Sequence, residues 1–194
     1  GPKVLQDLIR YGVNFSKNAQ GEYALGQEGG HAIRRILHQG DATGLEVISA
    51  LVAQLKAHPR ITCHEYHIAV NLIVTHTPHQ PDHQGEVLGA YVLAVKTGLV
   101  HTFLANQVIL ATGGAGKTYL YTSNPMVATG DGVAMAYRAG ARIGNMEFYQ
   151  FHPTMLYHKT LHHFLISEAL RGEGGRLINP QTGERFMERI APER

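Results

Sequence analysis

The sequence lacks several features on which whole classes of protein depend. It has a single cysteine, Cys63, so no internal disulfide framework can form. No apolar run approaches the roughly 20 residues that a membrane-spanning helix needs. Basic and acidic residues are nearly balanced, at 17 against 15, and they are scattered rather than gathered into a stripe that would neutralise phosphates. We therefore expect a cytoplasmic protein that binds neither nucleic acid nor membrane.

A secretory leader is also missing, because residues 1–3 (Gly-Pro-Lys) lead directly into an amphipathic helical pattern with Leu5, Leu8 and Ile9. A start at Gly-Pro without Met indicates a piece excised from a longer protein. The 194 residues fit one domain or slightly more, and a hydrophobic content of 44% is enough for a core. We expect a globular fold.

The strongest helical pattern lies in DATGLEVISALVAQLKAHP, residues 41–59, where Asp41 and Thr43 are capping residues. Thr43 and Glu46 fit a capping box, and the pattern stops at His58-Pro59. Its apolar residues recur at helical spacing: Leu45, Ile48, Val52 and Leu55. A second, shorter helix of small residues is predicted from Thr129 to Gly140.

Short runs rich in β-branched residues lie between the two helices, at 61–66, 68–74, 86–95, 99–105 and 107–112. The last four predict a β-meander with turns at 77–85, at 97–98 and at Asn106. Helices alternating with strands are typical of an α/β layer fold. From about residue 147 the pattern becomes irregular, so we expect residues 1–146 and 147–194 to belong to different domains.

A glycine-rich stretch at residues 110–118 has the ending of a nucleotide-triphosphatase phosphate loop, Gly-Lys-Thr. The rest of that pattern fails, because Ala111 stands where a glycine is needed and aromatic residues with a proline follow instead of a helix. What remains is an expected buried strand, Val108–Ala111, followed directly by residues 112–114. Those residues would lie at the carboxyl end of the strand, which is where α/β sheets bind ligands. A glycine turn that binds nothing explains the same residues equally well.

Histidine is abundant, with 13 residues, and two groups have spacings that suit a metal. Neither group offers a thiolate, a regular frame or a carboxylate that would orient the rings. We predict solvated loop residues and no metal site. The two groups are His76, His79 and His83, and His158, His162 and His163.

The stretch EFYQFHPT, residues 147–154, places polar groups inside an aromatic, strand-like segment. Alternation along a strand puts Gln150 and His152 on one side, Pro153 keeps His152 extended, and Phe148 and Phe151 are expected to pack. Such a pair suits a site that grips a polar ligand. Satisfying backbone groups is the ordinary alternative.

Charged and hydroxyl residues gather soon afterwards in ISEALRGEGG, residues 166–175. Taken separately they have ordinary explanations. Ser167 fits a helix N-cap, and Arg171 with Glu173 fits a surface salt bridge.

These motifs occur in the order ATGG, GDG, FxQFHPT and SEALRGEGG, and in that order the sequence resembles the flavoprotein family of succinate dehydrogenase, fumarate reductase and L-aspartate oxidase. The segments EGGHAIRRILHQGDATG and NPMVATGDGVAMAYRAGARIGNMEFYQFHPTMLYH are most similar to the L-aspartate oxidases, and the similarity runs roughly from Tyr11 to Phe186. The resemblance implies an incomplete FAD-binding Rossmann-like domain with a β-meander, followed by the start of an α+β capping domain.

The resemblance also implies contacts with FAD, held without a covalent bond. Asp131 would reach the ribose side, and the backbone around Ile68 and Ala69 would border the adenine. The residues that would lie against the cofactor are Thr112, Gly113 and Gly114.

For the substrate, a dicarboxylate such as L-aspartate or fumarate, the resemblance implies a second set of residues. Gln150 and His152 would bind at the substrate end, with His152 donating to a carboxylate, while Ser167 and Glu168 stand where the family has Thr-Glu. Glu28 would accept the substrate ammonium group. The expected product is iminoaspartate, with O₂ or fumarate as electron acceptor, in the quinolinate route to NAD with quinolinate synthase as a pathway partner.

Several parts of the family pattern are missing. The opening Gly-x-Gly-x-x-Gly is absent, the later His and Arg of the substrate clamp are absent, and Glu193 stands where the family has its catalytic arginine, a role that we do not assign to Arg194. We expect the 194-residue chain by itself to bind FAD weakly or not at all, to be inactive, and to self-associate through uncovered apolar faces. Two alternatives stay open: a soluble fumarate reductase, and a non-catalytic assembly module.

Overall fold

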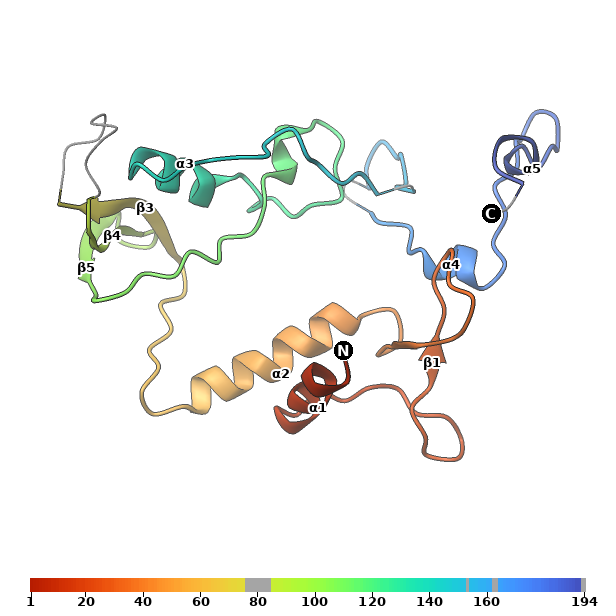
Figure 1. The fold of residues 1–194 in the computed structure, drawn as a ribbon, viewed down its shortest axis with the longest axis horizontal. Coiled ribbons are helices and arrows are strands. Elements are labelled where there is room, and N and C mark those ends of the chain that lie inside the picture. The colour runs from red at the N-terminus through yellow and green to blue at the C-terminus, as the bar shows by residue number, and fades with distance from the viewer. Residues whose placement is uncertain (76–84, 153, 162–163, 193–194) are drawn as a thin grey trace. The chain divides into compact units, whose positions relative to one another are not determined.

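The computed structural model describes residues 1–75, 85–152, 154–161 and 164–192 (Figure 1). The fold mixes helices with antiparallel sheets, in two compact units. Unit 1 comprises Gly1–Cys63 and Ile166–Arg194, and unit 2 comprises His64–Leu165. The expected boundary between residues 146 and 147 concerns domains of a longer protein and stays a prediction.

Unit 1 carries four helices and one short hairpin within the described residues. Both Val13 and Phe15 are buried, and the Phe15 ring meets Tyr23 edge-to-face at 6.3 Å between centroids. The elements are α1 (Pro2–Arg10), β1 (Leu25–Gly26), β2 (Ile36–Leu37), α2 (Thr43–Ala57), α4 (Ala169–Gly172) and α5 (Met187–Ile190). Two helices of this unit are predicted, one at the start of the chain and one after Asp41, and α1 and α2 confirm them.

Helix α2 begins one residue after Ala42, but without the predicted capping box. The Thr43 hydroxyl accepts a hydrogen bond from the backbone N–H of Gln39 at 3.0 Å. The Glu46 carboxylate accepts one from the backbone N–H of Asn14 at 2.8 Å. Contacts to the preceding loop and to a distant segment therefore occupy both side chains, and neither caps the helix.

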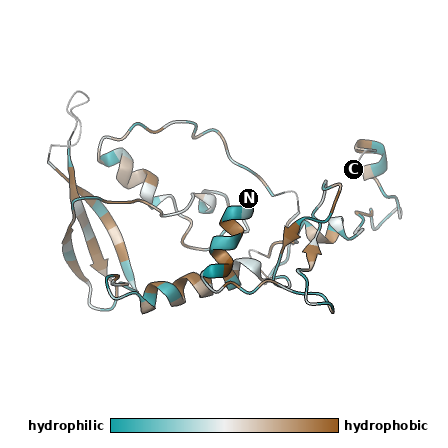
Figure 2. Ribbon diagram, turned by 60° about the horizontal axis from the view of Figure 1, so that its bottom comes forward, coloured by the Kyte–Doolittle hydropathy of each residue, from teal (hydrophilic) through white to brown (hydrophobic). Residues whose placement is uncertain are grey.

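The apolar stripe that predicts α2 is also its exposed side. Leu45 is 68% exposed and Ile48 is 62% exposed, whereas Val47 and Leu51 are half-buried. Figure 2 shows hydrophobic residues along this helix. Local periodicity thus predicts the helix correctly without telling which side packs inside unit 1.

No helix in the described ranges is long and apolar enough to cross a membrane.

Unit 2 contains the predicted meander as a three-stranded antiparallel sheet in the order β3-β4-β5. The turn at residues 97–98 is confirmed, with Gly98 in the left-handed region at φ 72°. The turn expected at 77–85 falls almost wholly outside the described residues. The elements are β3 (His67–Val74), β4 (Val87–Ala94), β5 (Leu99–Leu104), the 3₁₀ turn η1 (Gly116–Thr118) and α3 (Asp131–Arg138).

Three of the predicted strands are wrong. Residues 61–66, 107–112 and 147–152 lie outside every named strand, and within the described chain Ile109 of the expected buried strand is 87% exposed. β-branched and aromatic composition favours a strand only where a neighbouring strand supplies hydrogen-bonding partners. Among the described residues no strand does so for these segments.

Candidate cofactor and substrate site

The glycine-rich segment after residue 111 lies directly against the start of α3. The Gly130 backbone N–H donates to the Gly114 carbonyl at 3.2 Å. A Cβ added at the buried Gly132 would stand 1.8 Å from the Thr112 hydroxyl oxygen, so only glycine fits there. Folding thus joins two of the predicted cofactor motifs, ATGG and GDG, in one place.

This junction faces open space. Thr112, Gly113, Gly114 and Asp131 are all exposed, and a Cβ added at either Gly113 or Gly114 would meet no atom within 4 Å. Gly113 also has φ 75°, a conformation that side chains other than glycine rarely adopt. The junction therefore offers bare backbone beside a carboxylate, to which a ligand can approach closely.

Ile68 and Ala69, predicted to border an adenine, lie on β3. Ile68 is 49% exposed and Ala69 is half-buried, just before an irregularity in the pairing with β4. Arg138, the last residue of α3, donates to the Asn71 side chain and to the Val70 carbonyl, each at 3.1 Å. These bonds fix the far end of α3 to β3, so both predicted cofactor segments belong to one compact unit.

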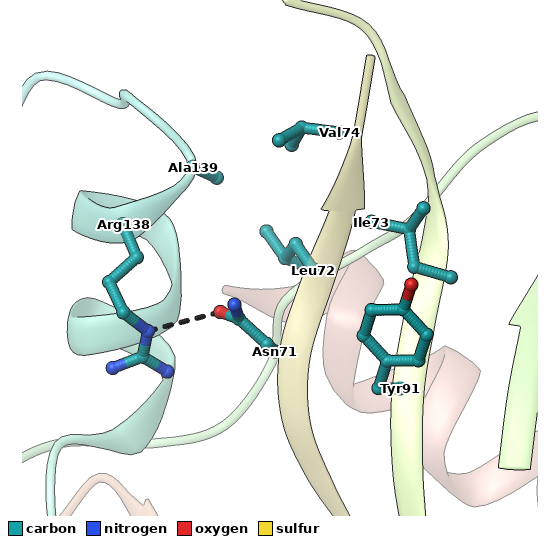
Figure 3. A pocket seen from close by; sticks show the side chains of 7 residues that line it. All are labelled: Asn71, Leu72, Ile73, Val74, Tyr91, Arg138 and Ala139. Carbon is teal, nitrogen blue, oxygen red and sulfur yellow. Dashed lines mark hydrogen bonds between the residues drawn. The ribbon is translucent and has the colours of Figure 1, made fainter. Parts of the chain in front are cut away.

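A shallow pocket occurs between α3 and β3, with a volume of about 180 Å³. Figure 3 shows Arg138 reaching from the helix toward Asn71, with Leu72 and Val74 on the same side of the strand. None of the predicted site residues lines this pocket. It is too small for a dinucleotide, and we do not assign the cofactor to it.

The Gly-Lys-Thr stretch forms only η1, and Tyr119 after it is extended. Gly116 is buried against Asn124, whose Cγ would be 2.2 Å from an added Cβ. A phosphate loop needs an α-helix at this point, so the rejection of a triphosphatase motif is confirmed.

Gln150 and His152 are both exposed and lie in irregular chain instead of a strand. The aromatic support is also different from the prediction, because Phe148 is 77% exposed. Tyr149 and Phe151 instead form a cluster with Tyr119, with ring centroids 4.6 to 5.2 Å apart. The predicted packing role is therefore met by Phe151 and not by Phe148, and Tyr149 joins Phe151 in the cluster.

The His152 ring is held by its own loop. Its Nδ1 lies 2.8 Å from the Thr154 carbonyl oxygen and 3.1 Å from the Thr154 backbone nitrogen. The carbonyl oxygen calls for a proton on Nδ1 and the N–H calls for a lone pair there, so these contacts orient the ring without selecting its tautomer, and they leave Nε2 free of both.

In unit 1 the loop that carries Glu28 is packed against the segment that carries Ser167 and Glu168. A Cβ added at Gly172 would stand 2.2 Å from the Gln27 carbonyl oxygen, and one at Gly29 would stand 3.1 Å from the Arg171 guanidinium. Two of the predicted substrate segments, distant in the sequence, thus lie together, while Gln150 and His152 belong to unit 2.

Ion pairs in this region differ from the predicted Arg171–Glu173 pair. Arg171 pairs with Glu168, three residues before it. Glu173 accepts two hydrogen bonds from Arg34, each at 2.6 Å. The pairing of Arg34 with Glu173 could not be predicted from the sequence, because the two residues are 139 positions apart. The Ser167 hydroxyl accepts from the Ala169 N–H at 3.2 Å, close to the capping role that its residue type predicts.

The Arg34 contact gives a pH-dependent prediction. The hydrogen bonds from Arg34 hold the pKa of Glu173 below its usual range, and the same contact raises the pKa of Arg34. A lowered carboxyl pKa stabilises the fold above the unfolded value of about 4.3, and this stabilisation is lost as the pH falls through the lowered folded value.

Glu173→Gln is therefore expected to lower the thermal midpoint at pH 7 and to have progressively less effect below about pH 4. The effect is small, because both side chains are about half exposed, at 52% and 51%. Melting curves of both proteins from pH 3 to 8 measure it. Repeating them in 1 M salt should reduce the difference, and a difference that does not depend on pH or salt would contradict this assignment.

Histidines of the two predicted groups fall mostly outside the described residues, namely His76, His79, His83, His162 and His163. His158 is described, and its Nδ1 accepts from the backbone N–H groups of Thr160 and Leu161, each at 3.2 Å. Within the described ranges no three His, Cys, Asp or Glu side chains gather in a way that would hold a metal.

A family model described as FAD binding domain matches residues 1–194. The chain belongs to this family of FAD-binding domains. L-aspartate oxidase 1 of Ralstonia nicotianae is 52% identical over 96% of this chain and 35% of its own length. L-aspartate oxidase of Pseudomonas aeruginosa is 49% identical over 98% of the chain and 36% of its own length. The chain therefore spans about a third of the length of the curated relatives it matches.

Solved structures give the same family. A variant of E. coli quinol fumarate reductase matches with a TM-score of 0.84 and 30% identity, over 97% of this chain and 30% of that chain. Sdh1 of Mycobacterium smegmatis matches with a TM-score of 0.72 and 36% identity, over 96% and 32%. The predicted resemblance to L-aspartate oxidases and to their flavoprotein family is confirmed, and so is FAD as the family's cofactor.

The residues at the ATGG and GDG junction fit such a cofactor. Exposed glycine backbone with free space above it admits a flat or phosphate-bearing group, and the Asp131 carboxylate is an acceptor for ribose hydroxyls.

Proposed function

We propose that this chain forms part of an FAD-dependent oxidase that converts L-aspartate to iminoaspartate. The observation that supports the proposal best is the packing of the loop that carries Glu28 against residues 167–173, because it brings together two segments to which we assign substrate contacts. The relatives named L-aspartate oxidase, about half identical over nearly the whole chain, support it.

The proposed cofactor contacts are those of unit 2. Thr112, Gly113 and Gly114 lie against FAD, Asp131 binds its ribose hydroxyls, and Ile68 with Ala69 borders the adenine. When bound, FAD accepts the hydride from the substrate Cα. In the longer protein, residues 1–146 belong to a Rossmann-like FAD-binding domain and residues 147–194 begin a capping domain.

The proposed substrate contacts follow from charge. Glu28, an exposed carboxylate, accepts the hydrogen bonds of the substrate ammonium group. His152, whose ring is held by the contacts of Nδ1 with Thr154, donates from Nε2 to a substrate carboxylate. Gln150 and the Ser167 hydroxyl add neutral donors, while Glu168 is held by its pair with Arg171. In the full-length protein, donors and acceptors of this kind orient the Cα–H bond of the substrate.

A second candidate is fumarate reduction by a soluble enzyme of the same family. The similarity to E. coli quinol fumarate reductase over 97% of the chain favours it. That activity needs no acceptor for an ammonium group, so Glu28 distinguishes the two candidates.

The first test is a titration of FAD against the 194-residue chain and against the full-length protein, followed by flavin fluorescence. We expect binding by the full-length protein, with aspartate-dependent peroxide formation, and weak or no binding and no turnover by the 194-residue chain. Failure of the full-length protein to bind FAD would contradict the oxidase and leave a non-catalytic module. Peroxide formation by the 194-residue chain would contradict its expected inactivity.

A further inference from the structure

The loop that carries Glu28 is the connection of the β1–β2 hairpin. The Arg35 backbone N–H closes it by donating to the Gly26 carbonyl at 3.1 Å. Inside the loop the His31 N–H donates to the Glu28 carbonyl at 3.1 Å, and Gly30 turns the chain at φ 85°. The described bonds of Glu28 are those of its backbone, so its position depends on how the whole loop is held.

Besides the approach of the Arg171 guanidinium to Gly29, two features hold this loop against the segment around α4. The first is the backbone contact of Gln27 with Gly172, which sets the distance between the two segments. The second is the Arg34–Glu173 pair, with two parallel hydrogen bonds of 2.6 Å. A bidentate guanidinium–carboxylate pair fixes orientation as well as distance. Arg34 is the next-to-last residue of the Glu28 loop and Glu173 follows α4 directly, so the pair joins the two segments close to β2 and to the end of α4.

An exposed ion pair usually contributes little to stability. Position is more sensitive than stability, because a displacement of about 1 Å at a reacting centre can lower a rate by about 100-fold. Losing this pair would leave the Glu28 loop joined to α4 by contacts that restrict its distance but allow it to swing.

We propose that Arg34 and Glu173 are positioning residues that hold the Glu28 carboxylate in place for the substrate ammonium group, and that they thereby set the preference for an amino dicarboxylate over an unsubstituted one. The inference rests on the proposed function. Neither residue touches the substrate. Both act through Glu28.

The test uses the full-length protein with Arg34→Met, Glu173→Gln and the exchanged pair Arg34→Glu with Glu173→Arg. Arg34→Met is expected to raise KM for L-aspartate by about tenfold or more with a smaller change in kcat, and KM for fumarate by less than about twofold. The exchanged pair should recover at least part of the aspartate KM, because it restores the bidentate contact with reversed direction. Arg10→Met is the matched control, because Arg10 pairs with Asp7 at 2.6 Å on α1, and it should leave both KM values unchanged.

Equal rises of KM for aspartate and fumarate would overturn the inference and leave a purely structural pair, and no rise for either would overturn it as well. Failure of the wild-type protein to oxidise aspartate is a failure of the proposed function. Amide hydrogen exchange then tests the positioning role. Arg34→Met should speed exchange at residues 28–33 by about tenfold or more, and Arg10→Met should not. Unchanged exchange would overturn the inference.

Discussion

Replacing Glu28 by glutamine in the full-length protein is expected to lower kcat/KM for L-aspartate by about 30-fold or more, corresponding to about 2 kcal/mol, with the largest part in KM. Glutamine has the same shape but no charge, so the substrate ammonium group loses its ionic partner. Fumarate has no ammonium group, and its reduction by a chemical reductant should change by less than about threefold. Steady-state oxygen consumption and fumarate reduction measure the two activities.

Glu22→Gln is the matched control for this substitution. Glu22 is an exposed glutamate of the same unit, and its carboxylate accepts a hydrogen bond from Asn18 at 3.3 Å in a neighbouring turn. It should leave both activities unchanged. Equal losses with aspartate and fumarate in Glu28→Gln would mean that Glu28 supports the fold. No loss with either would remove it from the site and favour the fumarate reductase candidate.

The sequence predicts those elements whose pattern is local. Helices α2 and α3 follow from spacing and from the glycine at 140, and strands β3, β4 and β5 follow from runs of β-branched residues with a turn at Gly98. The strand predicted at 107–112 fails for a nonlocal reason, because strand formation requires hydrogen bonds to a neighbour that no local pattern reveals. The capping box at Thr43 fails similarly, since Asn14 and Gln39 take its two acceptors.

The candidate site shows the same division. The order of motifs predicts which segments carry polar ligand-binding residues, and the structure brings ATGG beside GDG and the Glu28 loop beside α4. Partners within the site are not predictable in this way. Arg171 has both Glu168 and Glu173 within reach of its sequence position, and only the fold assigns it to Glu168 and leaves Glu173 to Arg34.

Exposed apolar side chains bear on the prediction that the isolated chain self-associates. Leu45 on α2 and Ile109 after the meander are 68% and 87% exposed. Apolar surface of this extent favours association, so self-association of the isolated 194-residue chain stays a prediction. The meander contributes to this surface, because Leu99 and Leu104 of β5 are 60% and 73% exposed.

The second large effect is expected from Gly132→Ala. The added Cβ would stand 1.8 Å from the Thr112 hydroxyl oxygen, so the segment 112–114 must move away from α3. Forcing a methyl group into such a contact costs about 1–3 kcal/mol, and the thermal midpoint should fall accordingly. If this segment lies against FAD, the displacement should also weaken FAD binding to the full-length protein by about tenfold or more. Flavin fluorescence titration and a melting curve without FAD measure the two effects.

Gly114→Ala separates cofactor contact from folding. Its Cβ would meet no atom within 4 Å, so the melting curve without FAD should stay unchanged, whereas FAD affinity should fall because the methyl group occupies the space in which the cofactor approaches the backbone. Gly44→Ala on α2 is the control, since its Cβ also meets nothing within 4 Å and alanine favours the helix by about 1 kcal/mol. It should bind FAD like the wild-type protein. Unchanged FAD affinity in both Gly114→Ala and Gly132→Ala would place the cofactor elsewhere, because the two substitutions obstruct the junction from its open side and from its packed side.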